Sequence, residues 1–165
     1  MKSITLLRHA KSSWKASGVT DRDRPLNKRG ERDAPIMGER IGANDIRPSL
    51  IVSSPAARSW ATAKLVADGI HYPREFLQRD ERLYLASVDS IIDVIADQDL
   101  GFNHIMLVGH NPGMTQFANF LVPNITMNLP TCGVVSVVID SDDWDLSSQP
   151  DATLTLLDYP KNGAY

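Results

Sequence analysis

Predicted strands and helices alternate along this chain, and that order limits the fold to one class. Runs that favour strands cover residues 3–8, 50–52, 75–78, 104–108, 134–139 and 152–157. Segments with helical spacing of apolar residues cover 27–44, 54–69, 87–97 and 114–121. Such alternation indicates a mostly parallel sheet with helices on both faces. The acidic segment 140–151 joins the last two strands, and this short connection predicts that they form an antiparallel hairpin at one edge of the sheet. We therefore expect a three-layer α/β/α sandwich.

Two helix starts can be predicted from their capping residues. Asn27 is a suitable N-cap for the first helix, because its side-chain oxygen can accept a hydrogen bond from a free backbone N–H. The second helix follows Ser53-Ser54-Pro55. We expect one of the two serines to cap it, with Pro55 at the first helical position.

Composition limits the class of protein. The 165 residues fit a single domain, 1–165, that can bury a core without disulfides or a metal. The net charge of −3 argues against general affinity for nucleic acid or an acidic membrane, so any basic site must be local. Cys132 is the only cysteine, which favours a reducing compartment. The chain opens without a signal-peptide pattern and has no run near the ~18 apolar residues of a transmembrane helix, so we expect a cytoplasmic protein.

Charged and imidazole side chains follow three of the predicted strands. Arg8 and His9 end the first strand, and His110 comes directly after the strand at 104–108. Arg58 falls in the first turn of the helix that follows the strand at 50–52. The carboxyl ends of parallel strands lie at one edge of a sheet, where ligands bind in open α/β folds. We therefore expect two imidazoles and two guanidiniums to converge there.

Such a group of side chains is suited to a dianion. Guanidiniums match phosphate oxygens, and free N–H groups at a helix N-terminus add partial positive charge. Arg8 beside His9 should lower the pKa of the imidazole and keep a neutral nitrogen available for attack. Each residue alone has a structural explanation, and the prediction rests on their joint position at three strand ends. His71 and His104 lack that position and are interpreted as structural or surface residues.

These motifs resemble those of a known family. Leu-Leu-Arg8-His9-Ala, the segment Ser53 to Arg58 with Thr62-Ala63 behind it, and Val-Gly-His110-Asn-Pro are similar to the three signatures of the histidine phosphatase superfamily, which includes the phosphoglycerate mutases. The resemblance spans residues 4 to about 140. The short chain and the segment Asp21–Gly30 most resemble the SixA-type phosphohistidine phosphatases. Many relatives have Gly where this chain has Ala10, and SixA-like members often have Ala.

The resemblance implies a role for each matching residue. His9 would attack phosphorus in line and become a transient phosphohistidine. Arg8, Arg58 and His110 would bind the equatorial phosphate oxygens as charge develops. Arg24, in the loop at 11–27, would be a further phosphate ligand; its alternative is solvent exposure in a loop of alternating charge. The implied activity needs no cofactor and no metal.

The proton for the leaving group is left open by the sequence. Relatives that act on alkyl phosphates use a carboxylic acid to protonate the alkoxide. Glu81, in Asp80-Glu81-Arg82-Leu-Tyr84, is the candidate acid, and its alternative is a surface carboxylate paired with Arg82 or Arg79. Phosphohistidine leaves more easily once its nitrogen is protonated and needs less help.

Two classes of partner follow from this, together with a non-catalytic alternative. A phosphorylated protein, such as a phosphohistidine-bearing signalling domain, is the first expected substrate. A small phosphomonoester is the second, and a phosphate-binding module without activity is the third possibility. Other phosphatase chemistries fit poorly: Val138 stands where a cysteine phosphatase with Cys132 would need Arg, and the chain has no Gly-x-x-x-x-Gly-Lys loop.

Overall fold

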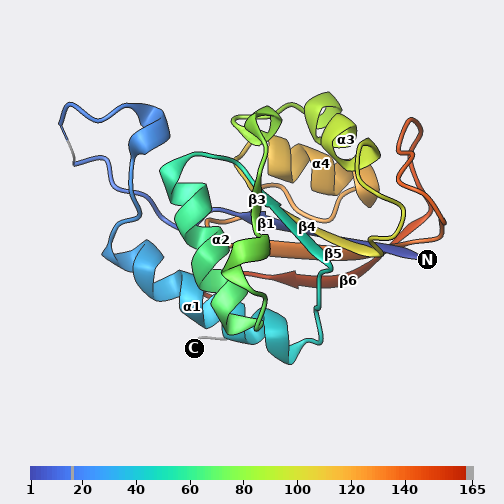
Figure 1. Ribbon diagram of the computed structural model, residues 1–165, viewed down its shortest axis with the longest axis horizontal. Coiled ribbons are helices and arrows are strands. Elements are labelled where there is room, and N and C mark those ends of the chain that lie inside the picture. The colour runs from blue at the N-terminus through green and yellow to red at the C-terminus, as the bar shows by residue number, and fades with distance from the viewer. Residues whose placement is uncertain (16, 163–165) are drawn as a thin grey trace.

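A six-stranded sheet with two helices on each face forms the computed structural model, which describes residues 1–15 and 17–162 (Figure 1). The strands are β1 (Lys2–Arg8), β2 (Leu50–Ser53), β3 (Gln78–Arg79), β4 (His104–Gly109), β5 (Val134–Ile139) and β6 (Ala152–Asp158). The α-helices are α1 (Lys28–Ala43), α2 (Ala57–Gly69), α3 (Val88–Ala96) and α4 (Gly113–Leu121). Short 3-10 helices are η1 (Asp21–Asp23), η2 (Arg74–Phe76) and η3 (Glu81–Leu83).

The sheet is parallel on one side and antiparallel at the other edge. Its strand order is β3-β2-β4-β1-β5-β6. β1, β2, β3 and β4 pair in parallel, whereas β5 pairs antiparallel with both β1 and β6. The predicted α/β/α sandwich with an antiparallel edge is therefore confirmed, including the hairpin whose loop is 140–151.

Two apolar cores hold the helices against the sheet. Neighbouring residues of a strand point to opposite faces, so Leu6 of β1 enters one core and Leu7 the other. α3 and α4 cover the face of Leu6, and α1 and α2 cover the face of Leu7 (Figure 1). A Cβ added at Gly69 would lie 2.6 Å from the backbone carbon of Gly38, so α1 and α2 need glycine at this close approach. This packing fixes the position of α2, which carries Arg58 at its start.

Local predictions are confirmed in part. The side chain of Asn27 caps α1, accepting a hydrogen bond from the N–H of Gly30 at 2.9 Å. The expected strand at 75–78 is instead η2 followed by the two-residue strand β3. The expected serine cap of α2 is wrong, because α2 begins at Ala57 and its N-cap, Ala56, makes no side-chain cap hydrogen bond. Within the described part of the chain, no helix is long and apolar enough to cross a membrane.

Candidate active site

The three predicted strand ends meet at one edge of the sheet. Arg8 is in register with Gly109, and the N–H of His9 donates to the carbonyl of Gly109 at 3.0 Å. Ser53, the last residue of β2, is in register with Val108 of β4. The rings of His9 and His110 consequently lie 5.2 Å apart, centroid to centroid. The convergence expected from the sequence is therefore present.

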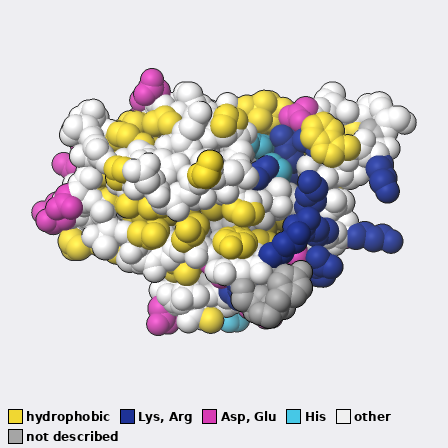
Figure 2. All heavy atoms as spheres, turned by 180° about the vertical axis from the view of Figure 1, so that it is seen from behind, with side chains coloured by type: hydrophobic (Ala, Val, Ile, Leu, Met, Phe, Trp, Pro, Cys, Tyr) yellow, Lys and Arg dark blue, Asp and Glu magenta, His cyan; other side chains and the backbone are white. Residues whose placement is uncertain are grey.

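These side chains line a cavity of about 240 Å³, called here the phosphate cavity. It is lined by Arg8, His9, Lys11, Ser12, Trp14, Asp21, Arg24, Arg58, Leu85, His110, Asn111 and Thr131. Figure 2 shows histidine side chains set into the surface beside a dense group of Lys and Arg side chains. The cavity therefore concentrates positive charge in a chain whose net charge is −3.

His9 is held in one tautomer. Its Nδ1 lies 2.7 Å from the carbonyl oxygen of Ala10, and a carbonyl can only accept, so Nδ1 carries the proton and Nε2 carries the lone pair. Burial is the largest cause that lowers the pKa of His9 to about 4. The hydrogen bond to Ala10 opposes this, and the charge of Arg58, ahead of that of Arg8, adds to it. His9 is thus a neutral imidazole with a free Nε2 at physiological pH. Burial, more than the adjacent arginine that the sequence emphasised, sets this state.

His110 is contacted by two serines, one of which, Ser54, is a helix-cap candidate of the sequence analysis. The hydroxyl of Ser54 lies 2.7 Å from Nε2 of His110, and that of Ser59 lies 3.4 Å away. The other ring nitrogen, Nδ1, is buried and has no hydrogen-bond partner in the structure. Burial, followed by the neighbouring His9, lowers the pKa of His110 to about 3. If Ser54 donates to Nε2, the proton of this neutral ring is on Nδ1, where it is available to an anion.

The two arginines also keep an unpartnered donor. Nη1 of Arg8 donates to the carbonyl of Leu129 at 2.9 Å, while its Nε is buried without a partner. Nε of Arg58 is also buried without a hydrogen-bond partner. Among the described residues, these two atoms and Nδ1 of His110 are the buried side-chain nitrogens and oxygens that lack a partner. Buried polar atoms are nearly always satisfied, so three unpartnered nitrogens on residues that line one cavity indicate a site suited to an acceptor-rich ligand.

Arg24 reaches the cavity from the loop before α1. Its Nη1 donates to the hydroxyl of Ser12 at 2.7 Å, and its guanidinium lies over the ring of Trp14, 3.5 Å from the centroid. Only 9% of Arg24 is exposed. The alternative of a solvated loop residue is therefore wrong.

Known proteins resemble this chain in sequence. The sequence pattern of the histidine phosphatase superfamily (branch 1) matches residues 4–83. An uncharacterised chloroplastic protein of Arabidopsis thaliana is 30% identical over 154 residues, covering 87% of this chain and 69% of that protein. This chain belongs to the histidine phosphatase superfamily. Together with the structural similarity to phosphatases of this superfamily, membership identifies the chain as a phosphatase enzyme.

Solved structures of other histidine phosphatases have the same fold. The phosphohistidine phosphatase SixA of Agrobacterium tumefaciens superposes with a TM-score of 0.82 at 27% identity, covering 96% of this chain and 98% of that one. A structure of the protein histidine phosphatase SixA complexed with tungstate has a TM-score of 0.80 at 20% identity, covering 97% and 98%. The resemblance to the SixA type that the sequence motifs indicated is thus also present in three dimensions.

Asp21 is a member of this histidine phosphatase site that sequence reasoning missed. Its carboxylate accepts hydrogen bonds from Arg24 at 3.1 Å, from Arg58 at 3.1 Å and from the hydroxyl of Tyr84. The bond from Tyr84 is the largest cause that lowers the pKa of Asp21 to about 2, and those from the arginines add to it. A signal was present in the sequence, since Asp21 stands three residues before Arg24 in a loop already assigned to the site.

Glu81 does not line the phosphate cavity of this histidine phosphatase. Its carboxylate lies in η3, is 70% exposed and pairs with Arg22. That hydrogen bond lowers the pKa of Glu81, the opposite of what a proton donor at neutral pH requires. Glu81 is therefore a paired surface carboxylate, as the alternative predicted, but its partner is Arg22 and not Arg82 or Arg79. Arg82 pairs with Asp80 and Asp97 instead.

The remaining candidates lie outside the site. Cys132 is buried, and burial raises the pKa of its thiol to about 12, so it is not a nucleophile. His104 starts β4 at the opposite edge of the sheet, where its Nε2 lies 2.7 Å from the hydroxyl of Thr5. Within residues 1–15 and 17–162, no group of three or more His, Cys, Asp or Glu side chains is placed to hold a metal ion.

Proposed function

We propose that this histidine phosphatase hydrolyses phosphohistidine on a protein through a covalent phosphohistidine at His9. The observation that carries the proposal is that the phosphate cavity contains a neutral imidazole nucleophile and no protonated carboxyl group. Asp21 is the one carboxylate among its lining residues, and its pKa of about 2 keeps it ionised.

The first step balances without a proton donor. Nε2 of His9 uses its lone pair to form a bond to phosphorus, and the P–N bond of the substrate breaks with its electron pair moving to the substrate ring. The substrate ring already carries a proton on its other nitrogen, so it leaves as a neutral imidazole. His9 keeps its proton on Nδ1, bonded to Ala10, throughout. One imidazole replaces another, and no acid is consumed.

The second step hydrolyses the phosphohistidine at His9 and regenerates the free enzyme. Water attacks phosphorus, the bond to Nε2 of His9 breaks, and the lone pair returns to that nitrogen while the proton of the water leaves with phosphate or solvent. Throughout both steps, the phosphoryl oxygens would accept hydrogen bonds from Arg8, Arg58 and Nδ1 of His110, whose buried donors lack partners in the structure. Arg24 adds a fourth cationic or hydrogen-bonding group.

An alkyl phosphate presents a different demand. Its leaving alkoxide must take up a proton as the P–O bond breaks. Glu81 is outside the cavity, Asp21 is ionised, and His110 is neutral, so none of them is a ready donor. A SixA structure of the same fold is complexed with tungstate, an oxyanion of phosphate-like shape, which supports a phosphoryl group as the ligand. These features favour phosphohistidine over small alkyl phosphomonoesters.

Substrate comparison tests the proposal. Purified protein is given a synthetic phosphohistidine peptide, para-nitrophenyl phosphate and glycerol phosphate, with wild type and His9→Ala in parallel. We expect turnover of the peptide and of the aryl ester, whose leaving group needs no acid, and little turnover of glycerol phosphate. His9→Ala should lose all activity, and wild type should form an acid-labile, alkali-stable phosphoprotein. Equal rates on glycerol phosphate and the peptide, or turnover without His9, would overturn the proposal.

A further inference from the structure

The phosphate cavity adjoins a series of two further hollows, and the three together are called the groove. A second hollow of about 790 Å³ shares Lys11, Ser12 and Trp14 with it. A third hollow of about 510 Å³ shares Pro25, Leu26 and Glu31 with the second. A small phosphomonoester would fill only the first of the three. Adjoining hollows in this order fit an extended chain that continues beyond the phosphorylated residue.

The second hollow is strongly basic. Lys11, Lys15, Lys28 and Arg29 line it, opposed by the carboxylate of Glu31. Among the described residues, Arg29 pairs with Asp33, whereas the three lysines take part in no ion pair. Figure 2 shows Lys and Arg side chains gathered at this end of the molecule. In a chain of net charge −3, unpaired lysines beside the site favour a negatively charged ligand.

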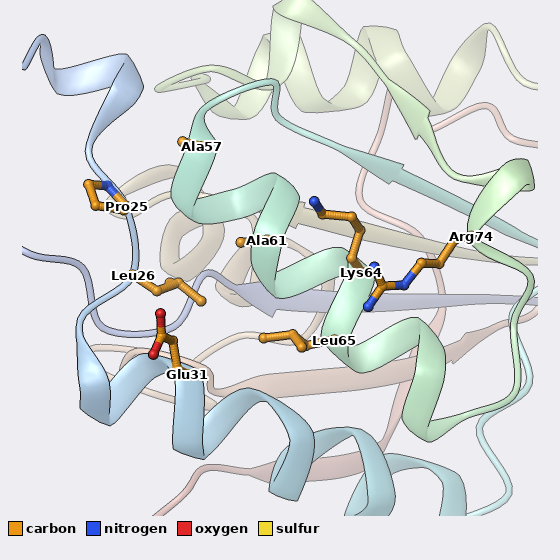
Figure 3. Close-up of a pocket in the computed structure, with 8 residues that line it drawn as sticks. All are labelled: Pro25, Leu26, Glu31, Ala57, Ala61, Lys64, Leu65 and Arg74. Carbon is orange, nitrogen blue, oxygen red and sulfur yellow. The ribbon is translucent and has the colours of Figure 1, made fainter.

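The third hollow has a different character. Figure 3 shows Leu26 and Leu65 facing each other between the start of α1 and the face of α2, with Ala57 and Ala61 along the helix. Lys64 and Arg74 stand at its far end. A mainly apolar hollow that follows a basic one suits a polypeptide better than a small bisphosphate, which has no group to fill it.

The loop that forms the basic hollow is held in place. The N–H of Asn27 donates to the carbonyl of Lys11 at 3.0 Å, and a Cβ at Gly30 would lie 2.2 Å from that same oxygen. Gly30 therefore allows the chain after β1 to lie directly on the first turn of α1. Lys11 and Lys28 are thus held close together by backbone contacts.

We infer that the basic hollow binds an acidic segment of the substrate protein, next to the phosphohistidine. This inference rests on the proposed function and extends it to the sequence around the phosphorylated residue. Aspartate or glutamate side chains there would pair with Lys15 and Lys28, and the phosphoryl group would lie in the phosphate cavity. Such contacts act largely through charge and weaken with salt.

Charge reversal at the groove tests the inference without touching the phosphate cavity. Lys15→Glu and Lys28→Glu are made singly and together, and Lys161→Glu is the matched control, since Lys161 lines none of the three hollows. Lys28 is the first residue of α1, where a carboxylate interacts favourably with the helix dipole, so its variant should fold. The probes are two phosphohistidine peptides of equal length, one with three glutamates beside the phosphohistidine and one with three serines. Both are also used as competitors of para-nitrophenyl phosphate hydrolysis.

We expect the acidic peptide to compete about tenfold better than the serine peptide at low salt. The preference should shrink at 0.5 M salt and vanish in the double variant. Lys161→Glu should keep the preference of wild type, and the rate on para-nitrophenyl phosphate should stay unchanged in every variant. Equal competition by the two peptides, or a preference that survives charge reversal, would overturn the inference. A nucleoside diphosphate that competes through the same lysines better than the acidic peptide would also overturn it. If the acidic peptide competes but neither peptide is hydrolysed, the groove stands and the proposed phosphohistidine activity fails.

Discussion

Asp21 holds Arg58 by two different groups. Nη2 of Arg58 donates to the Asp21 carboxylate at 3.1 Å, and Nη1 donates to the backbone carbonyl of the same residue at 2.6 Å. The guanidinium, which emerges from the first turn of α2, is thereby oriented by the loop that contains η1. Its Nε is buried without a partner, and the residue lines the phosphate cavity. Because the same carboxylate also binds Arg24, one side chain sets the positions of two cations.

Replacing Asp21 should therefore reduce activity by misplacing these cations. We expect Asp21→Ala to lower kcat/KM for para-nitrophenyl phosphate by about tenfold or more, the cost of losing charge-assisted hydrogen bonds. Asp21→Asn keeps an acceptor for one guanidinium and should lose less. Steady-state kinetics of the two variants checks this. An alanine variant as active as wild type would contradict the positioning role.

Arg58→Ala should cost catalysis more than folding. Arg58 is 2% exposed, and its removal deletes a proposed phosphate ligand. It also removes a buried Nε that has no partner and frees Asp21, whose side chain is 44% exposed and can be hydrated instead. We expect kcat/KM to fall by roughly a hundredfold or more, as for other lost groups that stabilise transition-state charge. The melting temperature, measured on the same preparation, should change by only a few degrees. A melting temperature that collapses together with activity would show that the residue is chiefly structural.

Glu81→Gln should leave the rate unchanged on all three substrates. Glu81 is exposed and paired with Arg22 outside the phosphate cavity, so it has no proton to give to a leaving group there. Parallel assays with Arg22→Gln control for the loss of the pair itself. A selective fall in the rate on glycerol phosphate in Glu81→Gln alone would return Glu81 to the role of acid.

Ser54→Ala tests how His110 is held. The Ser54 hydroxyl lies 2.7 Å from Nε2 of His110, and without it the imidazole loses its nearest partner. We expect a fall in kcat with a smaller change in KM, because the transition state gains more from the oriented ring than the bound substrate does. Ser54→Thr keeps the hydroxyl and should restore part of the activity. Failure of the threonine variant to exceed the alanine variant would argue for packing alone.

The sequence predicted the fold and the centre of the site for a physical reason. Strand ends in a parallel sheet share an edge, so Arg8, His9 and His110 could be placed together from their positions after apolar runs. Local sequence propensity could not predict hydrogen bonds between residues that are far apart in the chain. Ser54 precedes a helix and so resembles a cap, but its hydroxyl contacts His110, which directly follows the neighbouring strand β4.

The partner of Glu81 is a second contact that local sequence could not predict. Its neighbours in sequence are Asp80 and Arg82, and these suggested both its role and its possible partner. The contact with Arg22 spans 59 positions and depends on how the loop before α1 lies over η3. Asp21 belongs to that same loop, so its contacts with Arg58 and Tyr84 were also beyond what spacing along the chain can predict.

Two buried histidines, His9 and His110, and the partly buried His104 should make the protein less stable in acid. The pKa values of His9 and His104 are lowered to about 4 and that of His110 to about 3, chiefly by burial. In the unfolded chain these groups titrate near 6.5, so between that pH and 4 the unfolded state binds more protons. The free energy of unfolding should therefore be fully maintained above about pH 6.5 and fall as the pH drops toward 4. Each histidine contributes a slope of up to about 1.4 kcal/mol per pH unit.

His104→Gln separates this effect from catalysis. His104 lies at the opposite edge of the sheet from the phosphate cavity, where it contacts Thr5. Glutamine does not titrate, so the variant should lose one histidine's share of the pH dependence between 6.5 and 4 while it retains activity on para-nitrophenyl phosphate. Urea unfolding of wild type and variant at pH 7, 6 and 5 measures this share. An identical pH dependence in the two proteins would mean that His104 binds protons equally in the folded and unfolded states, in conflict with its lowered pKa.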